Sequence, residues 1–164
     1  MTVPEKLPAT TLAKYCYVSM FSGCKALTTA PILVATTLAE YCCSSMFYDC
    51  DSLVELPSNM LPATTLATCC YSNMFRECSN LTTPPNLPAT TLATGCYEWM
   101  FRYSSKVNYI KAMFTTLSSS YTNGWVMGIY NTTGTFVKNS AATWTNTFGD
   151  DAIPSGWTVT TASS

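Results

Sequence analysis

The sequence predicts an α/β repeat fold, a solenoid of about four repeats of 26–28 residues, each with a short strand and a short helix. Two observations lead to this prediction. Similar phrases begin at Leu7, Leu33, Leu61 and Leu87, so the offsets between them are 26, 28 and 26 residues. Self-similarity at a period of about 20–50 residues is typical of chains whose units pack on their neighbours. Within each phrase, apolar residues also recur every four positions, which favours one face of a helix.

The first repeat illustrates the predicted helix. Leu12, Cys16, Met20 and Cys24 are spaced by four residues and would lie on one helical face. A threonine hydroxyl just before this stretch is suited to cap the first turn, and Gly23 is suited to end the helix. Later repeats carry other residues in place of Gly23, so the predicted C-terminal stop is not uniform.

A short strand is expected after each helix, because a leucine is followed there by Thr or Val and then by a proline that cannot donate to a sheet. One repeat cannot bury both of its faces alone, so neighbouring repeats are expected to share one core. The predicted core consists of columns of leucine, cysteine, methionine and phenylalanine: Leu12, Cys16, Met20, Phe21, Cys24, Leu27, Leu38, Cys42, Met46, Phe47, Cys50, Leu53, Leu66, Cys70, Met74, Phe75, Cys78, Leu81, Leu92, Cys96, Met100 and Phe101.

The repeat pattern decays toward its C-terminal end. We therefore expect a solenoid over residues 1–114 and a β-rich capping segment over residues 115–164, within the same structural domain. The capping segment is rich in Gly, Asn and Thr, and its Trp125, Trp144 and Trp157 are large enough to seal an open core. No dedicated cap precedes the first repeat, so either a partner or a neighbouring chain covers that end, or the chain is a piece of something longer.

Composition excludes several classes of function. Only 10% of the 164 residues are charged, against roughly 25% in an average domain, and the net charge is −1. Lysines and arginines are scattered, so no basic stripe favours nucleic acid or an anionic membrane. No apolar run is long enough to predict a transmembrane helix, and the first residues lack the features of a secretory signal.

The nine cysteines follow the repeat rather than a metal-binding spacing. A disulfide scaffold and a metal site are both conceivable readings of so many cysteines. The chain has no histidine and no pair of cysteines separated by two residues, however. The favoured interpretation is that cysteine serves as a small buried apolar residue, one in each repeat. No metal and no cofactor are therefore predicted.

The phrase LP-ATTLAxYCYSxMFxxCxxLTxxP resembles the BspA-like, or Treponema-type, leucine-rich repeat. The matching elements in the first repeat are Pro8, Phe21, Cys24, Leu27 and Ala30, and the resemblance covers about residues 4–114. It implies a leucine-rich-repeat solenoid. The repeats are longer than is usual in that family, and Met-Phe stands where Ala-Phe is more common.

The C-terminal block GTFVKNSAATWTNTFGDDAIPSGWTV is similar to the terminal segment of repeat proteins from gut Bacteroidetes and their phages. This similarity implies a setting on a virion or a bacterial cell surface. It also implies a role in adhesion, receptor contact or host attachment.

The sequence offers little material for catalysis, since histidine, the usual general acid or base near neutral pH, is absent. Carboxylates cluster at Glu40, Asp49, Asp51 and Glu55 and again at residues 150–151, and solvated surface acids explain both groups. Residues 150–151 also have the oxygen ligands that calcium prefers, but they lack the alternating acidic pattern of a dedicated loop. The chain is therefore predicted not to be an enzyme.

The first hypothesis is a non-enzymatic binding or adhesion module that uses a leucine-rich-repeat surface. Its partner would be a protein or glycan ligand, with no nucleic acid and no membrane insertion. One alternative is a structural virion or assembly protein that packs against other subunits. Its oligomers would form through the uncapped N-terminal end. A weaker alternative is a thiol-based metal or redox protein. The predicted binding residues project from the strands on the concave face: Thr28, Thr29, Glu55, Thr82, Thr83, Asn108, Tyr109 and Lys111.

Overall fold

The computed structural model describes residues 3–162, and regular secondary structure in this part of the chain is sparse. Strands β1 (Lys6–Leu7) and β2 (Ile32–Leu33) pair in parallel. Strands β3 (Tyr109–Ala112), β4 (Thr135–Lys138) and β5 (Thr158–Thr161) form a parallel sheet in the order β3-β4-β5. The single helix of the described residues, α1, covers Ser119–Thr122, and at four residues it is too short to cross a membrane.

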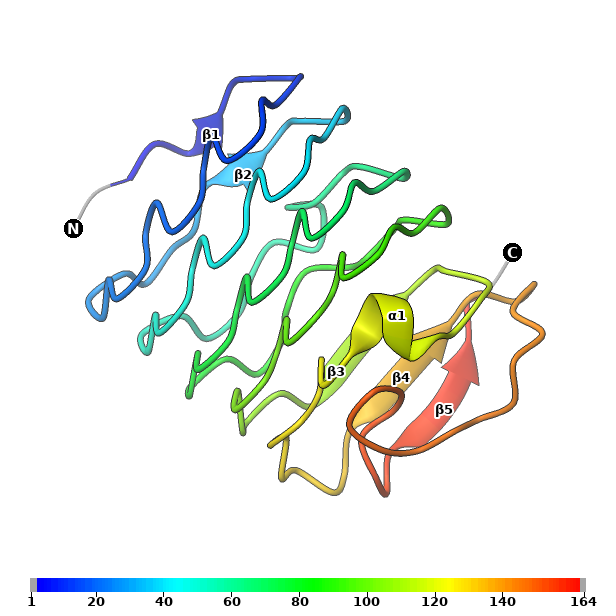
Figure 1. Ribbon diagram of the computed structural model, residues 1–164. Coiled ribbons are helices and arrows are strands. Elements are labelled where there is room, and N and C mark those ends of the chain that lie inside the picture. The colour runs from blue at the N-terminus through cyan, green and yellow to red at the C-terminus, as the bar shows by residue number, and fades with distance from the viewer. Residues whose placement is uncertain (1–2, 163–164) are drawn as a thin grey trace.

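The four repeats, residues 7–32, 33–60, 61–86 and 87–112, lie side by side in sequence order (Figure 1). We call them repeats 1 to 4. Strand β3 belongs to repeat 4, and strands β4 and β5 and helix α1 lie beyond it at the end of this row (Figure 1). Strands β1 and β2 lie at the opposite end (Figure 1).

The leucine-rich-repeat solenoid of alternating strand and helix is wrong. The four stretches predicted to contain helices, residues 14–23, 40–49, 68–77 and 94–103, are continuous runs of turns. The strands expected near Leu27–Pro31 and Leu53–Pro57 are also missing, and only the two-residue β2 lies close to the first of them. We call the four runs the turn segments.

Backbone hydrogen bonds in the turn segments alternate between two kinds. In repeat 1, the N–H of Val18 donates to the carbonyl of Tyr15, three residues back, at 3.3 Å. The N–H of Tyr17 instead donates to the carbonyl of Cys42 in repeat 2, at 2.8 Å. Tight turns satisfy half of the N–H groups in this way, and the neighbouring repeat satisfies the other half. A helix would satisfy all of them internally, so the partner repeat takes the place of helical bonding.

One residue in every four of a turn segment has a positive φ. In repeat 1 these residues are Tyr15 (61°), Ser19 (54°) and Gly23 (71°). Non-glycine residues rarely adopt this conformation, because it brings Cβ close to a carbonyl oxygen at about 1–2 kcal/mol each. The described residues contain ten such cases: Tyr15, Ser19, Tyr41, Ser45, Asp49, Cys69, Asn73, Glu77, Trp99 and Tyr103. The backbone conformation therefore repeats every four residues, and this repetition is the physical origin of the four-residue apolar period.

Each turn directs one pair of side chains into the core and the next pair outward. In repeat 2, Cys42 and Cys43 point inward and are fully buried, as are Met46 and Phe47 four residues later. The intervening residues 44–45 are only half-buried. The core consequently lies under one side of the turn segments and is continuous from repeat to repeat.

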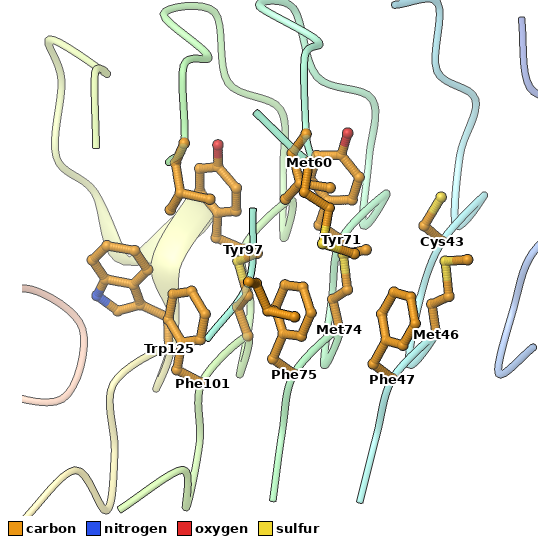
Figure 2. Packing of buried hydrophobic residues seen from close by; sticks show 14 of the residues in the cluster. Cys43, Met46, Phe47, Met60, Tyr71, Met74, Phe75, Tyr97, Phe101 and Trp125 are labelled. Atoms are coloured by element: carbon orange, nitrogen blue, oxygen red, sulfur yellow. The ribbon is translucent and has the colours of Figure 1, made fainter. Parts of the chain in front are cut away.

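Aromatic rings at equivalent positions stack along this core (Figure 2). The ring centroids of Phe21 and Phe47 are 5.3 Å apart, those of Phe47 and Phe75 5.6 Å, and those of Phe75 and Phe101 6.0 Å, with interplanar angles of 6–8°. Trp125 lies 6.1 Å from Phe101 and ends the row. Offset stacks of this kind add about 0.5–1.5 kcal/mol per pair beyond the burial of area.

Most of the predicted core residues are buried. Five of the twenty-two are not: Cys24, Leu38 and Leu92 are half-buried, and Cys16 and Met20 are exposed. Cys16, Met20 and Cys24 all belong to repeat 1, which has no repeat in front of it. Their exposure therefore follows from a missing neighbour rather than from a different local conformation.

The C-terminal segment agrees with its prediction in part. Within the predicted β-rich capping segment, Thr135–Lys138 and Thr158–Thr161 form strands β4 and β5. Residues 123–128 of that segment form turns. Trp125 and Trp157 are buried, whereas Trp144 is half-buried. β4 and β5 add to β3 in parallel, and so the pairing of equivalent segments continues to the end of the described chain.

Candidate binding surfaces

The predicted binding residues lie along one side of the row of repeats. Glu55 of repeat 2 pairs with Thr83 of repeat 3 through a parallel bridge, and Tyr109 pairs with Thr135. The N–H of Asn108 donates to the carbonyl of Thr82 at 3.0 Å. The structure therefore brings these positions together, one repeat after another, as the spacing of the repeat requires.

This side of the molecule carries few of the residue types that dominate binding energy. Thr28, Thr29, Glu55 and Asn108 are exposed, whereas Thr82, Thr83, Tyr109 and Lys111 are half-buried. Thr29 and Glu55 line a hollow of about 340 Å³ between repeats 1 and 2. Threonine is under-represented among the residues that dominate binding energy, and it suits an exposed extended backbone.

A second surface lies on the outer side of the turn segments and is richer in chemistry. Tyr48, Arg76, Trp99, Arg102 and Tyr103 form what we call the arginine–aromatic cluster. The guanidinium carbon of Arg76 lies 5.5 Å from the Tyr48 ring centroid and 5.8 Å from that of Trp99. The guanidinium carbon of Arg102 lies 5.1 Å from the Trp99 ring and 4.9 Å from the Tyr103 ring. Trp99 is thus in contact range of two cations, each within the usual cation–π distance.

Glu77 fixes one end of this cluster. Its carboxylate accepts a hydrogen bond of 2.9 Å from the Tyr48 hydroxyl and forms an ion pair of 3.1 Å with Arg76. The hydrogen bond to Glu77 raises the pKa of Tyr48, since the carboxylate favours the protonated phenol. A guanidinium held by a carboxylate and two rings has lost most of its freedom before any partner arrives.

A cleft of about 350 Å³ adjoins the cluster and shares Trp99 with it. Met127 and Phe148 contribute further apolar surface to its lining, and Asn123 and Asp150 contribute polar groups. Phe148 is 49% exposed, so its ring is available to a partner. The cleft therefore combines ring faces with hydrogen-bonding groups in one place.

Gly124 allows Trp99 to lie flat beside this cleft. A Cβ atom on Gly124 would be 2.8 Å from the Cδ1 atom of Trp99, which is closer than real Cβ contacts. Gly124 also has a φ of 56°, a conformation that costs other residues about 1–2 kcal/mol. Both facts make this glycine part of the support for the Trp99 ring.

The sequence-based reasoning missed the cluster. Tyr48, Arg76 and Arg102 each stand two residues before the position of the second cysteine column, at Cys50, Cys78 and Ser104. A signal was therefore present, because large and charged residues occupy one column of an otherwise monotonous phrase. The column was overlooked because the sequence-based reasoning placed all binding residues on the predicted strands.

Three of the four acidic residues of repeat 2, Glu40, Asp49 and Asp51, are engaged in ion pairs. Lys25 lies 3.2 Å from Asp49 and 3.1 Å from Asp51, and Lys14 lies 2.7 Å from Glu40. A hydrogen bond from Ser79, together with Lys25, lowers the pKa of Asp51. A general acid at neutral pH needs a raised carboxyl pKa, so Asp51 is poorly suited to that role.

The cysteines are mostly buried, and several donate hydrogen bonds. The thiols of Cys50 and Cys78 donate at 3.1 Å to the carbonyls of Phe21 and Phe47, each in the preceding repeat. In repeat 4 the hydroxyl of Ser104 makes the equivalent bond to Phe75, at 2.6 Å. Cysteine in this column is therefore more than a small apolar residue, because its thiol links consecutive repeats.

Burial keeps these thiols protonated. It raises the pKa of Cys50 to about 12 and that of Cys96 to about 11. Nucleophilic and metal-binding cysteines need the thiolate form. All nine cysteines are free, and residues 3–162 contain no group of three side chains positioned to hold a metal ion.

Comparison of the chain with protein-family models, with curated proteins and with solved structures finds no match in any of the three.

Proposed function

We propose that this chain is a non-enzymatic binding module whose contact surface is the arginine–aromatic cluster together with the adjoining cleft. The observation that supports this most directly is the position of Trp99, whose ring is 5.8 Å from the guanidinium carbon of Arg76 and 5.1 Å from that of Arg102 and borders an open cleft. Tryptophan, tyrosine and arginine are the residue types that dominate binding energy at protein surfaces. Here they are gathered on one side of a molecule with few charged residues.

The chemistry of the cleft favours a ligand with an apolar face and several hydroxyl groups. The rings of Trp99 and Phe148 offer flat apolar contact, and the side chains of Asn123 and Asp150 offer a donor and acceptors beside them. A glycan at a cell or particle surface has both features, and so it is the ligand class that we propose. The placement on a phage particle or bacterial surface rests on the resemblance of the C-terminal block alone.

A second candidate function is that of a structural assembly protein. The observation that favours it is the exposure of core-type side chains at the N-terminal end, where Met20 is 50% exposed. A subunit packed against that end would remove this apolar surface from water.

An array of defined bacterial surface glycans tests the proposal, with bound protein detected directly. Wild-type chain should bind a subset of the glycans, and Trp99→Ala should lose that binding. Lys111→Ala on the threonine-rich side, away from the residues that line the cleft, is the matched control, and it should bind as the wild type does. Binding that survives Trp99→Ala would contradict the proposed surface, and absence of any glycan binding would favour the assembly role.

A further inference from the structure

The end face of repeat 1 exposes side chains that every later repeat buries. Met20 is 50% exposed, whereas Met46, Met74 and Met100, which occupy the same position in repeats 2 to 4, are fully buried. Cys16 is exposed, and its counterparts Cys42, Cys70 and Cys96 are fully buried. The composition of this face is thus that of an internal contact between repeats.

The backbone of the same face has unused acceptors. In repeats 2 to 4, alternate carbonyls of each turn segment accept N–H groups from the preceding repeat; in repeat 2 these belong to Glu40, Cys42, Ser44, Met46 and Tyr48. Their counterparts in repeat 1 accept no hydrogen bond from any residue between 3 and 162: Lys14, Cys16, Val18, Met20 and Ser22. A row of unpaired carbonyls beside apolar side chains is a template for another chain.

The strand side of the N-terminal end is protected in a way that the turn side is not. Strand β1 presents Lys6 and is flanked by Pro4 and Pro8, which are exposed. Lysine and proline on an edge discourage pairing with a further strand. On the turn segment, by contrast, the inward positions 16 and 20 carry neither a charge nor a proline. Any partner is therefore directed to the turn segment.

We propose that this face binds a repeat of the same turn type, oriented with its alternate N–H groups toward repeat 1. The polarity of the backbone dictates this orientation. Repeat 1 offers carbonyls only, so two copies of this chain cannot satisfy these groups face to face. The corresponding N–H groups of repeats 1 to 4 already donate to the next segment of the same chain. The partner must bring donors of its own.

The contact between repeats 1 and 2 shows what the partner should provide. There, five N–H···O bonds of 2.8–3.3 Å join the turn segments, from Tyr15, Tyr17, Ser19, Phe21 and Gly23. The Tyr15 ring stacks on Tyr41 and the Phe21 ring on Phe47, each at 5.3 Å between centroids. A partner repeat with aromatic residues at these two positions would extend both stacks by one ring. This surface is separate from the arginine–aromatic cluster, and the inference does not depend on glycan binding.

Alkylation of Cys16 in the full chain measures occupation of the face, because this thiol is exposed and the equivalent thiols are buried. The probe is a synthetic peptide with the sequence of residues 87–112, and a scrambled peptide of the same composition is the control. Modification is followed by mass spectrometry of the fragment that contains Cys16. At a concentration about ten times its Kd, the peptide of native sequence should slow the alkylation of Cys16 by about tenfold, and the scrambled peptide should have no effect.

A variant with a charge on the face makes the test specific. Met20→Lys should abolish the protection while leaving both the far-ultraviolet spectrum and the glycan binding of the chain unchanged. The proposal is overturned if the peptide of native sequence fails to protect Cys16 from alkylation or if the scrambled peptide protects it equally. It is also overturned if Cys16 becomes protected by raising the concentration of the chain alone, since a second copy would then be the occupant.

Discussion

Core-type side chains are exposed at the N-terminal end of the row of repeats and buried at its C-terminal end. At the N-terminal end, Met20 is 50% exposed and Cys16 is exposed, although repeated core columns contain both. At the C-terminal end, Trp125 is fully buried against Phe101 and Tyr97, with ring centroids 6.1 Å away in both cases. The turn segments of the two regions have the same backbone conformation, so the difference lies in the neighbour and not in the residue.

This contrast teaches that a repeat contributes stability mainly through the contacts it makes with the next one. An interior repeat buries its methionine and phenylalanine between two neighbours, whereas repeat 1 has only one neighbour. The free energy of local opening should therefore be lowest at repeat 1 and rise toward the middle of the row. The predictions below test this gradient.

Removal of Trp125 should produce the largest loss. Trp125→Ala opens the end of the aromatic row and removes the hydrogen bond of 2.8 Å from its indole to the carbonyl of Ala152. We expect the free energy of unfolding to fall by about 3–5 kcal/mol, the usual cost of truncating a buried tryptophan. Chemical denaturation measures this, with Trp99→Ala as a half-buried control. A loss equal to that of the control would mean that Trp125 does not close the core.

Truncation of the equivalent methionines should separate the middle of the row from its N-terminal end. Met74→Ala leaves a cavity in a fully buried site and should cost about 2–5 kcal/mol. Met20→Ala at the exposed end face should stay within about 0.5 kcal/mol of the wild type. Both values come from the same denaturation experiment. Equal losses would contradict the gradient.

Two glycines with the same conformation should respond differently to alanine. Gly23 and Gly128 have φ values of 71° and 80°. A Cβ on Gly23 meets nothing within 4 Å, so Gly23→Ala should cost only the backbone strain of about 1–2 kcal/mol. A Cβ on Gly128 would collide with the Tyr103 ring, and so Gly128→Ala should cost about 2–4 kcal/mol. Thermal unfolding of both variants makes the comparison, and a larger effect at Gly23 would contradict it.

The ion pair at the N-terminal end should give the smallest effect, visible only in acid. A hydrogen bond from Ser79, together with the ion pair to Lys25, lowers the pKa of Asp51 in the folded chain below its unfolded value of about 3.9. Its contribution is therefore present above that pH and is lost as the pH falls through the lower folded pKa. Asp51→Asn should flatten the acid decline of stability by less than about 1 kcal/mol. An identical decline in the variant would show that Asp51 is not paired in solution.

The buried columns could be read from the sequence because each inward position recurs with the same residue type. Phe47, Phe75 and Phe101 are three such positions, and the structure stacks their rings. The backbone conformation between these inward positions could not be predicted, because an apolar period of four residues is close to the period of a helix. A helix has about 3.6 residues per turn, so residues spaced strictly by four drift by about 120° from Leu12 to Cys24. That drift was the available evidence against a helix.

The chemistry of the outward positions was a second signal. Ser19, Gly23, Ser45, Asp49 and Asn73 are residue types that favour turns, and all five have a positive φ. The same positions hold Tyr15, Glu77 and Trp99 elsewhere, which conceals the pattern. The arginine–aromatic cluster was missed for a different reason, because binding residues were sought on the predicted strands and not on the outer side of the turn segments.

The central claim is that alternate N–H groups of each turn segment donate to the next repeat. Scalar couplings across hydrogen bonds, measured by NMR on isotope-labelled chain, test it directly. The structure requires a coupling between the amide nitrogen of Phe47 and the carbonyl carbon of Met74, whose hydrogen bond is 3.0 Å long. Couplings from Phe47 to the carbonyl four residues earlier in its own segment would instead show a helix, and would contradict the account.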